Sequence, residues 1–440
     1  MSQTSRARRF GLLGRTLGHS YSPQIHERLG SVPYDLVELP DEASVRAFFD
    51  RMRSGEGGLS GVNVTIPYKR VAFSCADELS DAARRLGNVN TVVARADGTL
   101  FGDNTDYHGF SRLVRSCGVD PAGLTCLVLG DGGAASTARA ALADMGAAEV
   151  LTACRRGPLT FDALAADEGL RARVGLIANC TPVGMHPHEA DAPLVDPADF
   201  PSLACVVDMV YNPLRTRLVQ RARELGVPCA GGLLMLVAQA KRSSDEFLGA
   251  SRPDSVEDEV VAAVLRELAC LSVIGMPGSG KTTMGRRLER LRGMGRVDVD
   301  ELIEARAGMH PSRVIAERGE DAFRQVETAC TAEATSAPGR VVTCGGGVVT
   351  RPENLAWLRQ NGPVMLLTRG LSADDGECLS TAGRPLSQAI GVERLRQERG
   401  PLYRAWADFS VGPDTPDDDL LALVDDALAN WHALRAADPA

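Results

Sequence analysis

A glycine-rich segment in the second half of the chain restricts the possible folds more than any other feature. The apolar run Leu271–Ile274 is followed by Gly275-Met-Pro-Gly-Ser-Gly-Lys-Thr282 and by a helical pattern from Thr283 to Leu291. A strand, a G-x-x-x-x-G-K-T loop and a helix in this order form the pattern of a P-loop, whose backbone N–H groups surround phosphate oxygens. The segment therefore predicts a nucleotide-binding loop at the end of a parallel strand.

The side chains of this loop have defined tasks in phosphoryl transfer. Lys281 is expected to reach the β- and γ-phosphate oxygens of ATP, and the Thr282 hydroxyl to ligate Mg²⁺. The predicted ATP contacts are Gly275, Gly278, Ser279, Gly280, Lys281, Thr282 and Thr283.

A second glycine-rich turn lies in the first half of the chain. The apolar run Thr125–Leu129 leads into Gly130-Asp-Gly-Gly133 and an alanine-rich helix that ends near Met145. Glycines let a backbone approach a pyrophosphate, and the positive end of the helix dipole favours it. The turn predicts a dinucleotide site, with an ordinary tight strand-to-helix turn as the alternative.

Two arginines favour one dinucleotide over the other. Arg155 and Arg156 follow the apolar run Val150–Cys154, where dinucleotide folds contact the adenosine ribose. An acidic residue there favours NAD, whereas arginine suits the 2′-phosphate of NADP. NADP(H) is therefore the expected cofactor, and a pair of solvated surface arginines is the alternative. The predicted contacts are Gly130, Gly132, Gly133, Ala134, Arg155, Arg156, Met209 and Gly232.

Short apolar runs alternate with helical patterns throughout the 440 residues, which is typical of parallel α/β sheets. We predict an α/β fold in two parts. Residues 8–268 form the first part, which has two lobes. One lobe consists of residues at about 8–108 together with helices at about 232–268, and the other is a Rossmann lobe at about 109–231. Residues 269–440 form a P-loop domain with a central parallel sheet. The boundary is a helix that enters at Ser255, with Asp258 three residues later as a capping pattern.

Composition excludes several classes of partner. The net charge of −9 and an aromatic content of 5% argue against nucleic acid. No uncharged apolar run reaches eighteen residues, and the apolar run after the basic N-terminus is too short for a secretory signal, so we expect a cytoplasmic protein without membrane contact. The eleven cysteines include no C-x-x-C pair and are expected to be reduced and mostly buried.

Ordered polar motifs across the first part resemble the shikimate dehydrogenase family. They are His19-Ser-Tyr-Ser-Pro23, Asn63-Val-Thr-Ile-Pro-Tyr-Lys69, Gly87-Asn-Val-Asn-Thr91, Asn104-Thr-Asp106, Gly130-Asp-Gly-Gly133, Asn179-Cys-Thr-Pro-Val-Gly-Met185, Asp208-Met-Val-Tyr-Asn-Pro213 and Met235-Leu-Val-Ala-Gln239. The sequence departs from the family at Asn88, usually a small residue, and at Cys154, often Asn.

The resemblance implies reduction of 3-dehydroshikimate by NADPH, with Lys69 and Asp106 as the catalytic pair. Such a reaction needs a positioned acid to protonate the alkoxide that forms when hydride reaches a ketone carbon. A purely structural ion pair is the alternative for these two residues. The substrate carboxylate and hydroxyls would be held by Ser20, Ser22, Asn63, Thr65, Asn90, Tyr211 and Gln239.

The second part resembles shikimate kinase in the order and spacing of its motifs. They are Val297-Asp-Val-Asp300, Gly319-Glu-Asp-Ala-Phe-Arg-Gln-Val-Glu327, Gly345-Gly-Gly347, Arg384-Pro-Leu386 and Arg399-Gly-Pro-Leu-Tyr403.

This resemblance implies a role for each polar residue of those motifs. Asp298 would assist the Mg²⁺ ion, and Asp300 would accept a hydrogen bond from the attacking hydroxyl, with the role of base as a further option. Arg324 and Arg399 would clamp the substrate carboxylate, with Glu327 orienting Arg324. The Gly346 and Gly347 amides would approach the ring, and Arg384 on a lid would meet the transferring phosphate. The lid lacks an arginine that the family often places before Arg384-Pro-Leu, and Ser387 replaces a leucine.

The combined hypothesis is one chain with two consecutive activities on small-molecule substrates. The first would make shikimate and the second would convert it to shikimate 3-phosphate, in a monomer or homodimer. Two alternatives stay open: one part is only a binding or scaffolding module, or quinate is the dehydrogenase substrate.

Overall fold

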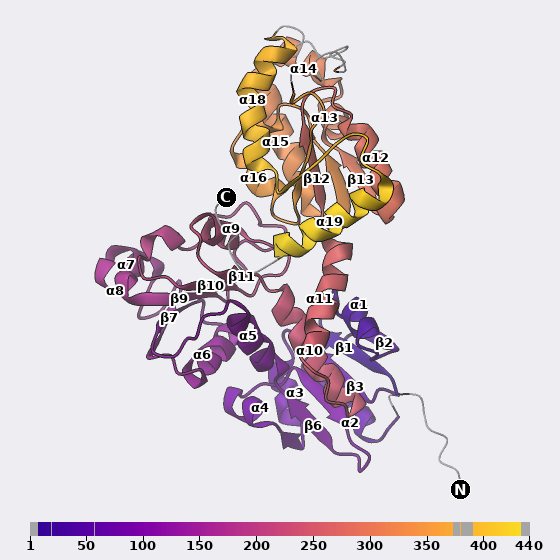
Figure 1. The fold of residues 1–440 in the computed structure, drawn as a ribbon. Helices are drawn as coiled ribbons and strands as arrows, with labels where there is room; N and C mark the ends of the chain where they lie inside the picture. The colour runs from indigo at the N-terminus through magenta and orange to yellow at the C-terminus, as the bar shows by residue number, and fades with distance from the viewer. Residues whose placement is uncertain (1–7, 19, 57, 373–378, 380–389, 433–440) are drawn as a thin grey trace.

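The computed structural model describes residues 8–432 except 19, 57, 373–378 and 380–389, and its described residues form three sheets with helices packed against them. Figure 1 shows the three sheets as separate layers, with the third one above the other two. Alternating strands and helices produce the α/β architecture that the sequence predicts.

The first sheet is mixed and has the strand order β2-β1-β3-β5-β6-β4. Only the β3–β5 and β5–β6 pairs are antiparallel. The strands are β1 (Phe10–Gly14), β2 (Tyr34–Glu38), β3 (Gly61–Val64), β4 (Glu78–Leu79), β5 (Thr91–Ala94) and β6 (Leu100–Asp103). The helices between them are α1 (Ser22–Arg28), α2 (Glu42–Arg53), α3 (Lys69–Cys75) and α4 (Asp81–Leu86), and α5 (Thr105–Ser116) follows β6.

The second sheet is parallel and has the order β11-β10-β9-β7-β8. Its strands are β7 (Thr125–Leu129), β8 (Glu149–Ala153), β9 (Val174–Asn179), β10 (Cys205–Asp208) and β11 (Cys229–Ala230). Its helices are α6 (Gly133–Asp144), α7 (Phe161–Ala166), α8 (Glu168–Arg173), η1 (Pro197–Asp199) and α9 (Arg217–Glu224). The order reverses between β7 and β9, which is where open α/β sheets bind ligands at the carboxyl ends of their strands.

The third sheet is also parallel and has the order β13-β14-β12-β15-β16. Its strands are β12 (Leu271–Gly275), β13 (Gly295–Asp298), β14 (Arg340–Thr343), β15 (Val364–Leu367) and β16 (Phe409–Val411). The helices are α12 (Lys281–Arg292), α13 (Val299–Ala307), α14 (Pro311–Arg318), α15 (Glu320–Ser336), η2 (Val348–Thr350), α16 (Glu353–Leu358), α18 (Val392–Trp406) and α19 (Asp417–His432).

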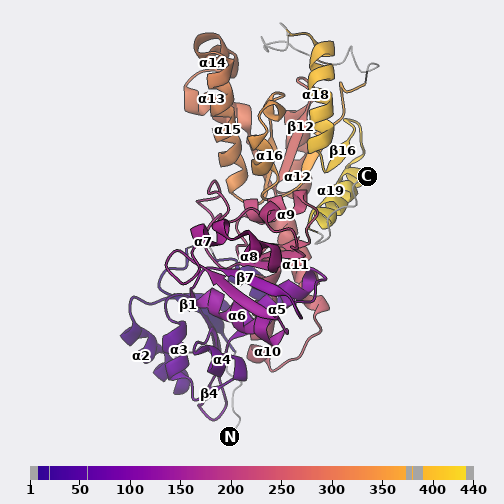
Figure 2. The same ribbon diagram turned by 90° about the vertical axis from the view of Figure 1, so that its left-hand side faces the viewer.

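Two helices connect the lower sheets with the upper one. α10 (Leu233–Leu248) and α11 (Ser255–Leu268) lie beside α5, and β12 begins three residues after α11 ends (Figures 1 and 2). The expected capping pattern at Ser255 is wrong, because Asp254 is the N-cap and makes no side-chain capping bond. The Glu257 carboxylate of the first turn is instead fully buried and bonds to Arg112 Nε at 3.0 Å.

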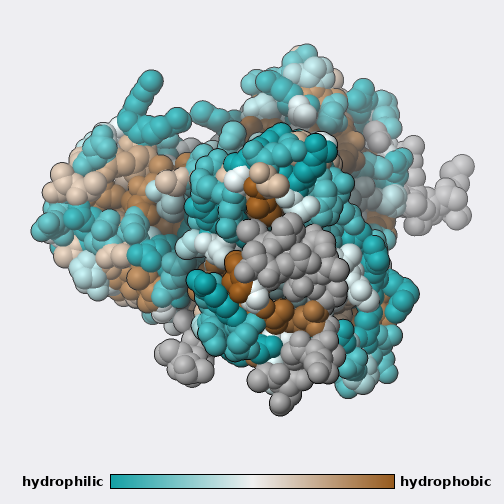
Figure 3. Space-filling view, turned by 90° about the horizontal axis from the view of Figure 1, so that it is seen from above, coloured by the Kyte–Doolittle hydropathy of each residue, from teal (hydrophilic) through white to brown (hydrophobic). Residues whose placement is uncertain are grey.

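One hydrophobic cluster runs through the junction between the lower and upper sheets. It includes Val264 of α11, Val273 of β12 and Trp431 of α19, together with residues of α5, α6 and α10. Burial of a continuous apolar surface stabilises the two parts against each other. Seen from above, hydrophilic residues cover most of the described surface, with small apolar patches between them (Figure 3).

The cysteines and the helices of the described residues agree with what the composition predicts. Ten cysteines are described, all free, and eight of them are buried. Within the described part of the chain, no helix has the length and apolar character needed to cross a membrane.

Candidate active sites

The first candidate site centres on an ion pair between two helix N-termini. Lys69 is the first residue of α3 and Asp106 is the second residue of α5. Lys69 Nζ lies 2.5 Å from Asp106 Oδ2, and the two side chains are 29% and 20% exposed. The pair is therefore held in place but open to a small molecule.

A network of polar side chains joins four elements beside this pair. Asn90 Oδ1 accepts a hydrogen bond from the Thr105 backbone N–H at 2.7 Å. Thr105 Oγ1 lies 3.5 Å from Gln239 Oε1 of α10 and 3.2 Å from Thr91 Oγ1. Asn63 of β3 donates from Nδ2 to Thr91 Oγ1 at 3.1 Å. The network thus brings Asn63, Asn90 and Gln239 next to the helix that carries Asp106.

The remaining predicted substrate residues lie at the edges of this network. Ser20 Oγ accepts a hydrogen bond from the Ser22 backbone N–H at 3.2 Å. Between these serines, the Tyr21 ring meets the Tyr211 ring edge-on, 5.7 Å between centroids, and burial raises the pKa of Tyr211. Thr65 follows β3 and packs against Gly14, where an added Cβ would lie 2.7 Å from Thr65 Cγ2. Tyr211 is the residue that the second sheet contributes to this group.

The predicted dinucleotide contacts lie at the carboxyl edge of the second sheet. Gly130 follows β7 with φ +104°, and a Cβ there would lie 2.9 Å from Thr181 Cγ2, so the turn requires glycine. Gly132 is the N-cap of α6, and Gly133 and Ala134 begin the helix. Their unpaired N–H groups therefore face the same edge of the sheet.

The other four dinucleotide contacts come from β8, β10 and α10. Arg155 and Arg156 are exposed just after β8 ends. Gly232 is the N-cap of α10, and a Cβ there would lie 2.2 Å from the Met209 carbonyl oxygen. This close approach places the Met209 and Gly232 backbones together at the carboxyl end of β10.

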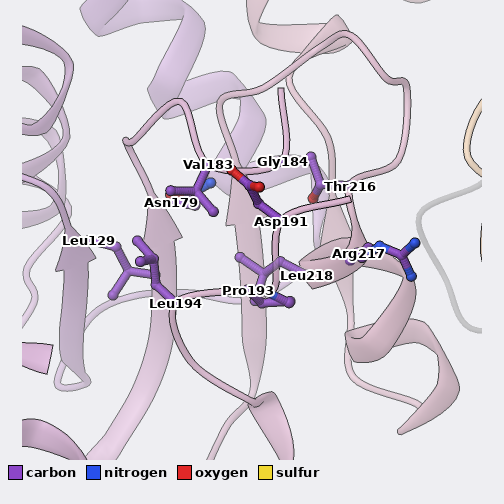
Figure 4. A pocket seen from close by; sticks show the side chains of 10 residues that line it. All are labelled: Leu129, Asn179, Val183, Gly184, Asp191, Pro193, Leu194, Thr216, Arg217 and Leu218. Atoms are coloured by element: carbon purple, nitrogen blue, oxygen red, sulfur yellow. The ribbon is translucent and has the colours of Figure 1, made fainter. Parts of the chain in front are cut away.

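A buried carboxylate fixes the loops at this edge. Asp208 Oδ1 accepts hydrogen bonds from Asn179 Nδ2 and the Val210 N–H, both at 3.0 Å, and Oδ2 accepts from Thr216 Oγ1 at 2.6 Å. Burial nevertheless raises the pKa of Asp208 to about 6. A cavity lined by Asn179 and Thr216 lies beside these loops (Figure 4).

The second candidate site begins at the loop between β12 and α12. Gly275, Gly278 and Gly280 have φ values of +150°, +80° and +97°, which side chains other than glycine rarely adopt. Lys281 Nζ donates to the Gly275 and Met276 carbonyl oxygens at 3.0 and 2.9 Å. This curled loop is the shape that surrounds phosphate groups.

Two further loop hydroxyls suit a phosphate and its metal ion. The Ser279 hydroxyl is buried and has no hydrogen-bond partner among the described residues. Thr282 Oγ1 lies 3.0 Å from Asp298 Oδ2, at the end of β13, and Thr283 is exposed in the next position. A hydroxyl and a carboxylate oxygen are the hard ligands that Mg²⁺ prefers, so these residues fit the ion.

The glycine loop after β14 brings the remaining acceptor-site residues together. A Cβ on Gly347 would lie 1.9 Å from Arg324 Nη1, and one on Gly345 would lie 3.1 Å from Asp300 Oδ1. The Gly346 carbonyl accepts from Arg399 Nη1 at 2.9 Å, and its Cβ position meets Pro277 of the P-loop at 2.7 Å. The three glycines thus allow Asp300, Arg324 and Arg399 to converge beside the phosphate loop.

Acidic partners hold Arg324 in a fixed orientation. Arg324 is 5% exposed and donates from Nη1 to Glu327 Oε2 at 2.6 Å and from Nη2 to Glu320 Oε1 at 3.1 Å. Burial lowers the pKa of Arg324, but the two carboxylates more than reverse this effect and raise it overall. Burial also raises the pKa of Glu327, whose Oε1 has no partner among the described residues.

Comparisons with known proteins match two separate stretches of the chain. Residues 12–92 match the model of the shikimate dehydrogenase substrate binding domain, and residues 277–424 match that of shikimate kinase. Shikimate dehydrogenase (NADP⁺) of Acidiphilium cryptum is 38% identical over 287 residues, which cover 61% of this chain and 99% of the relative. The Symbiobacterium thermophilum enzyme is 35% identical over 58% of this chain and 94% of its own length. This chain belongs to the shikimate dehydrogenase family.

Solved structures agree with the family assignment of the first part. A chorismate mutase/shikimate 5-dehydrogenase fusion protein from Clostridium acetobutylicum has a TM-score of 0.53 and 32% identity, and covers 58% of this chain and 96% of its own. The shikimate 5-dehydrogenase of Thermus thermophilus, in complex with NADP(H) and shikimate, has a TM-score of 0.50 and 31% identity, with coverages of 58% and 99%. The relatives thus account for the dehydrogenase part, and the kinase match accounts for most of the rest.

Several residues of the two sites carry contacts that the sequence analysis did not assign. Thr91 and Thr105 link the substrate residues of the dehydrogenase part, and both belong to motifs quoted for the resemblance. In the kinase part, the Tyr403 hydroxyl donates to the Gly346 carbonyl beside Arg399. The sequence offers a signal for each of these residues, because each is a polar residue inside a motif that carries one of the two resemblances.

The three residues that depart from the family patterns differ in their structural environments. Asn88 accepts at Oδ1 from Asn104 Nδ2 at 2.6 Å, and Asn104 is the N-cap of α5, so Asn88 supports the helix that carries Asp106. Cys154 is buried after β8, and its Sγ lies 2.5 Å from the Cβ position of Gly157. Ser387 lies outside the described residues, as does Arg384, which matches the family pattern.

Proposed function

We propose that this chain reduces 3-dehydroshikimate to shikimate with NADPH and then phosphorylates shikimate with ATP to give shikimate 3-phosphate. The observation that carries the proposal is the presence of two separate and differently equipped sites, Lys69 with Asp106 in one and Lys281 with Asp300 and Arg324 in the other. Each set contains the groups that its reaction requires.

In the first reaction, bound NADPH supplies a hydride to the ketone carbon of the substrate. Lys69 then donates a proton from Nζ to the carbonyl oxygen, which becomes the new hydroxyl group. Asp106, 2.5 Å away, orients Lys69 and pairs with its ammonium group until the proton is transferred. Arg155 and Arg156 would hold the 2′-phosphate of NADPH, which favours NADP over NAD.

In the second reaction, a substrate hydroxyl attacks the γ-phosphorus of ATP and the bond to the β-phosphate oxygen breaks. Asp300 accepts first a hydrogen bond and then the proton from the attacking hydroxyl, ADP leaves, and Lys281 neutralises charge on the phosphate oxygens. Thr282 and Asp298 would hold Mg²⁺, whose charge further stabilises the phosphates when it is bound. Arg324 and Arg399 bind the substrate carboxylate, for which planar guanidinium groups are well suited.

Two substitutions test the proposal. Lys69→Met should abolish NADPH oxidation with 3-dehydroshikimate and preserve ATP consumption with shikimate, and Lys281→Met should have the opposite effect. Loss of both activities in either variant, although it remains folded by circular dichroism, would contradict two independent sites. A wild-type protein that performs only one reaction would instead support the alternative in which one part is a scaffold.

The identity of the acid substrate needs its own comparison. The paired serines Ser20 and Ser22 favour shikimate over quinate by family analogy. Measuring kcat/KM for both acids with NADP⁺ separates the two, and a higher value for quinate would overturn this part of the proposal.

A further inference from the structure

A cavity lies at the junction between the dehydrogenase and kinase parts. Its lining includes Arg215, from the loop between β10 and α9, and Trp431 of α19, together with Arg223 of α9. The remaining lining residues are Leu214, Val219, Cys229, Ala230, Gly231 and Leu233. Residues far apart in the sequence thus enclose one space.

Two buried hydrogen-bond donors on the lining of this cavity have no acceptor within the described part of the chain. Arg215 is 8% exposed and Trp431 is 4% exposed. Among the described residues, neither Arg215 Nη2 nor Trp431 Nε1 has a hydrogen-bond partner. A buried donor without a partner costs free energy, so unpaired donors of this kind indicate that an acceptor is missing.

The Arg215 side chain also carries a positive charge that is poorly compensated. Its guanidinium carbon lies 3.7 Å from the centroid of the Trp431 ring, which provides a cation–π contact and no negative charge. Burial lowers the pKa of Arg215 well below its usual range, and the neighbouring Arg223 guanidinium adds to the shift. Because arginine keeps its proton in proteins, the charge stays in place and requires a counterion.

The nearby carboxylate is already committed to other groups. Asp408 attracts Arg215 electrostatically. However, its Oδ1 lies 3.6 Å from Arg359 Nη2, and its Oδ2 accepts the Val364 backbone N–H at 2.7 Å. Asp408 therefore does not supply the missing acceptor for Arg215 Nη2.

We propose that this cavity binds a small oxyanion, such as a phosphate or carboxylate group, between Arg215 and Trp431. An oxyanion accepts several hydrogen bonds at once and neutralises the guanidinium charge, whereas a water molecule satisfies only the hydrogen bonds. The two functions proposed above do not require this site.

The position of the cavity connects the anion with both parts of the chain. The Arg215 backbone N–H donates to the Gln360 carbonyl at 2.9 Å, and the Leu214 N–H donates to Asn361 Oδ1 at 2.9 Å, so this loop joins the kinase part directly. Gly231 and Leu233 flank Gly232, a predicted NADP contact. Anion binding is therefore expected to change the KM for NADPH.

Inorganic phosphate is the probe for the test. Calorimetric titration of the full chain, with NADP⁺ and ADP at saturation to occupy other phosphate sites, should detect one phosphate site that is lost in Arg215→Met. Trp431→Phe keeps the ring and removes only its N–H, so phosphate affinity should fall roughly tenfold, as for one charge-assisted hydrogen bond. Arg313→Met, at an exposed arginine of α14, is the matched control and should bind phosphate as the wild type does.

Thermal unfolding, again with NADP⁺ and ADP at saturation to occupy the other phosphate sites, provides a second measurement. Phosphate should raise the Tm of the wild type and of Arg313→Met, and it should leave the Tm of Arg215→Met unchanged. Without phosphate, Arg215→Met should be at least as stable as the wild type, because it removes an uncompensated buried charge.

Three outcomes would overturn the proposal. The first is an unchanged number of phosphate sites in Arg215→Met, and the second is no phosphate site in the wild type, which would leave water as the occupant. The third is phosphate binding that occurs only in a chain that ends at His432, because a carboxylate of the chain itself would then occupy the cavity.

Discussion

Lys69 and Asp106 lie on the first turns of two different helices, α3 and α5, and their side chains meet at 2.5 Å. The contact depends on how α3 and α5 are packed, since 37 positions separate the two residues in the sequence. Asn104 caps α5 and bonds to Asn88, and Asn90 accepts the Thr105 N–H, so the position of Asp106 is determined by its neighbours.

The role of this pair is tested by Asp106→Asn. The amide has no negative charge to pair with Lys69 Nζ or to orient it for proton transfer, so we expect kcat for shikimate oxidation to fall by roughly 10²-fold or more. ATP turnover with shikimate should be unchanged, which provides the internal control. A kcat within a factor of about two of the wild type would show that the ion pair is only structural.

The dinucleotide preference is tested by replacing both arginines after β8. Arg155→Ala combined with Arg156→Ala should raise the KM for NADPH by roughly ten- to a hundredfold, because charge-assisted hydrogen bonds to the 2′-phosphate are lost. The KM for NADH, which lacks this phosphate, should change little. Equal losses with both cofactors would indicate that the arginines do not contact the 2′-phosphate.

The buried Asp208 predicts a dependence of stability on pH. Burial raises its pKa to about 6, above the ordinary aspartate value of 3.8, so the folded state binds the proton more tightly than the unfolded chain. The stabilisation from this proton is complete below about pH 4 and is lost as the pH rises through about 6.

The measurement is urea unfolding between pH 4 and pH 7 for the wild type and Asp208→Asn. The wild type should lose stability relative to the variant over this range, by an amount on the order of 3 kcal/mol. Parallel pH curves for the two proteins would contradict the raised pKa.

The close approach of Gly347 and Arg324 makes a specific prediction for the kinase site. Gly347→Ala would place a methyl group 1.9 Å from Arg324 Nη1, so Arg324 must move. The KM for shikimate should rise at least tenfold, as expected when one partner of a bidentate pair is displaced. Gly295→Ala is the matched control, because nothing lies within 4 Å of its Cβ position. Equal KM values in both variants would exclude Arg324 as a carboxylate ligand.

Local patterns explain why much of the two sites could be predicted from the sequence. The P-loop is one continuous segment, and Gly275, Gly278 and Gly280 are glycines because the loop needs positive φ values. The last helix carries its apolar residues on one face, and Leu420, Val424 and Trp431 of that face are buried.

Contacts between distant segments explain what the sequence could not provide. The capping pattern at Ser255 does not describe how the helix start is held. Glu257 of the first turn instead pairs with His108 and Arg112, which lie 149 and 145 positions earlier in the chain. Similarly, no local pattern relates Arg215 to Trp431, whose contact arises only when the last helix packs against the junction. In the sequence, Glu257 and Arg215 look like ordinary charged surface positions, because the contacts that bury them form only when distant segments are brought together.

The most direct test of the central claim is a single incubation of the purified chain with 3-dehydroshikimate, NADPH, ATP and Mg²⁺. Two sites on one chain predict that one NADPH is oxidised and one ADP is formed for each shikimate 3-phosphate detected by mass spectrometry. Accumulation of shikimate without its phosphate, or no oxidation of NADPH, would contradict the account.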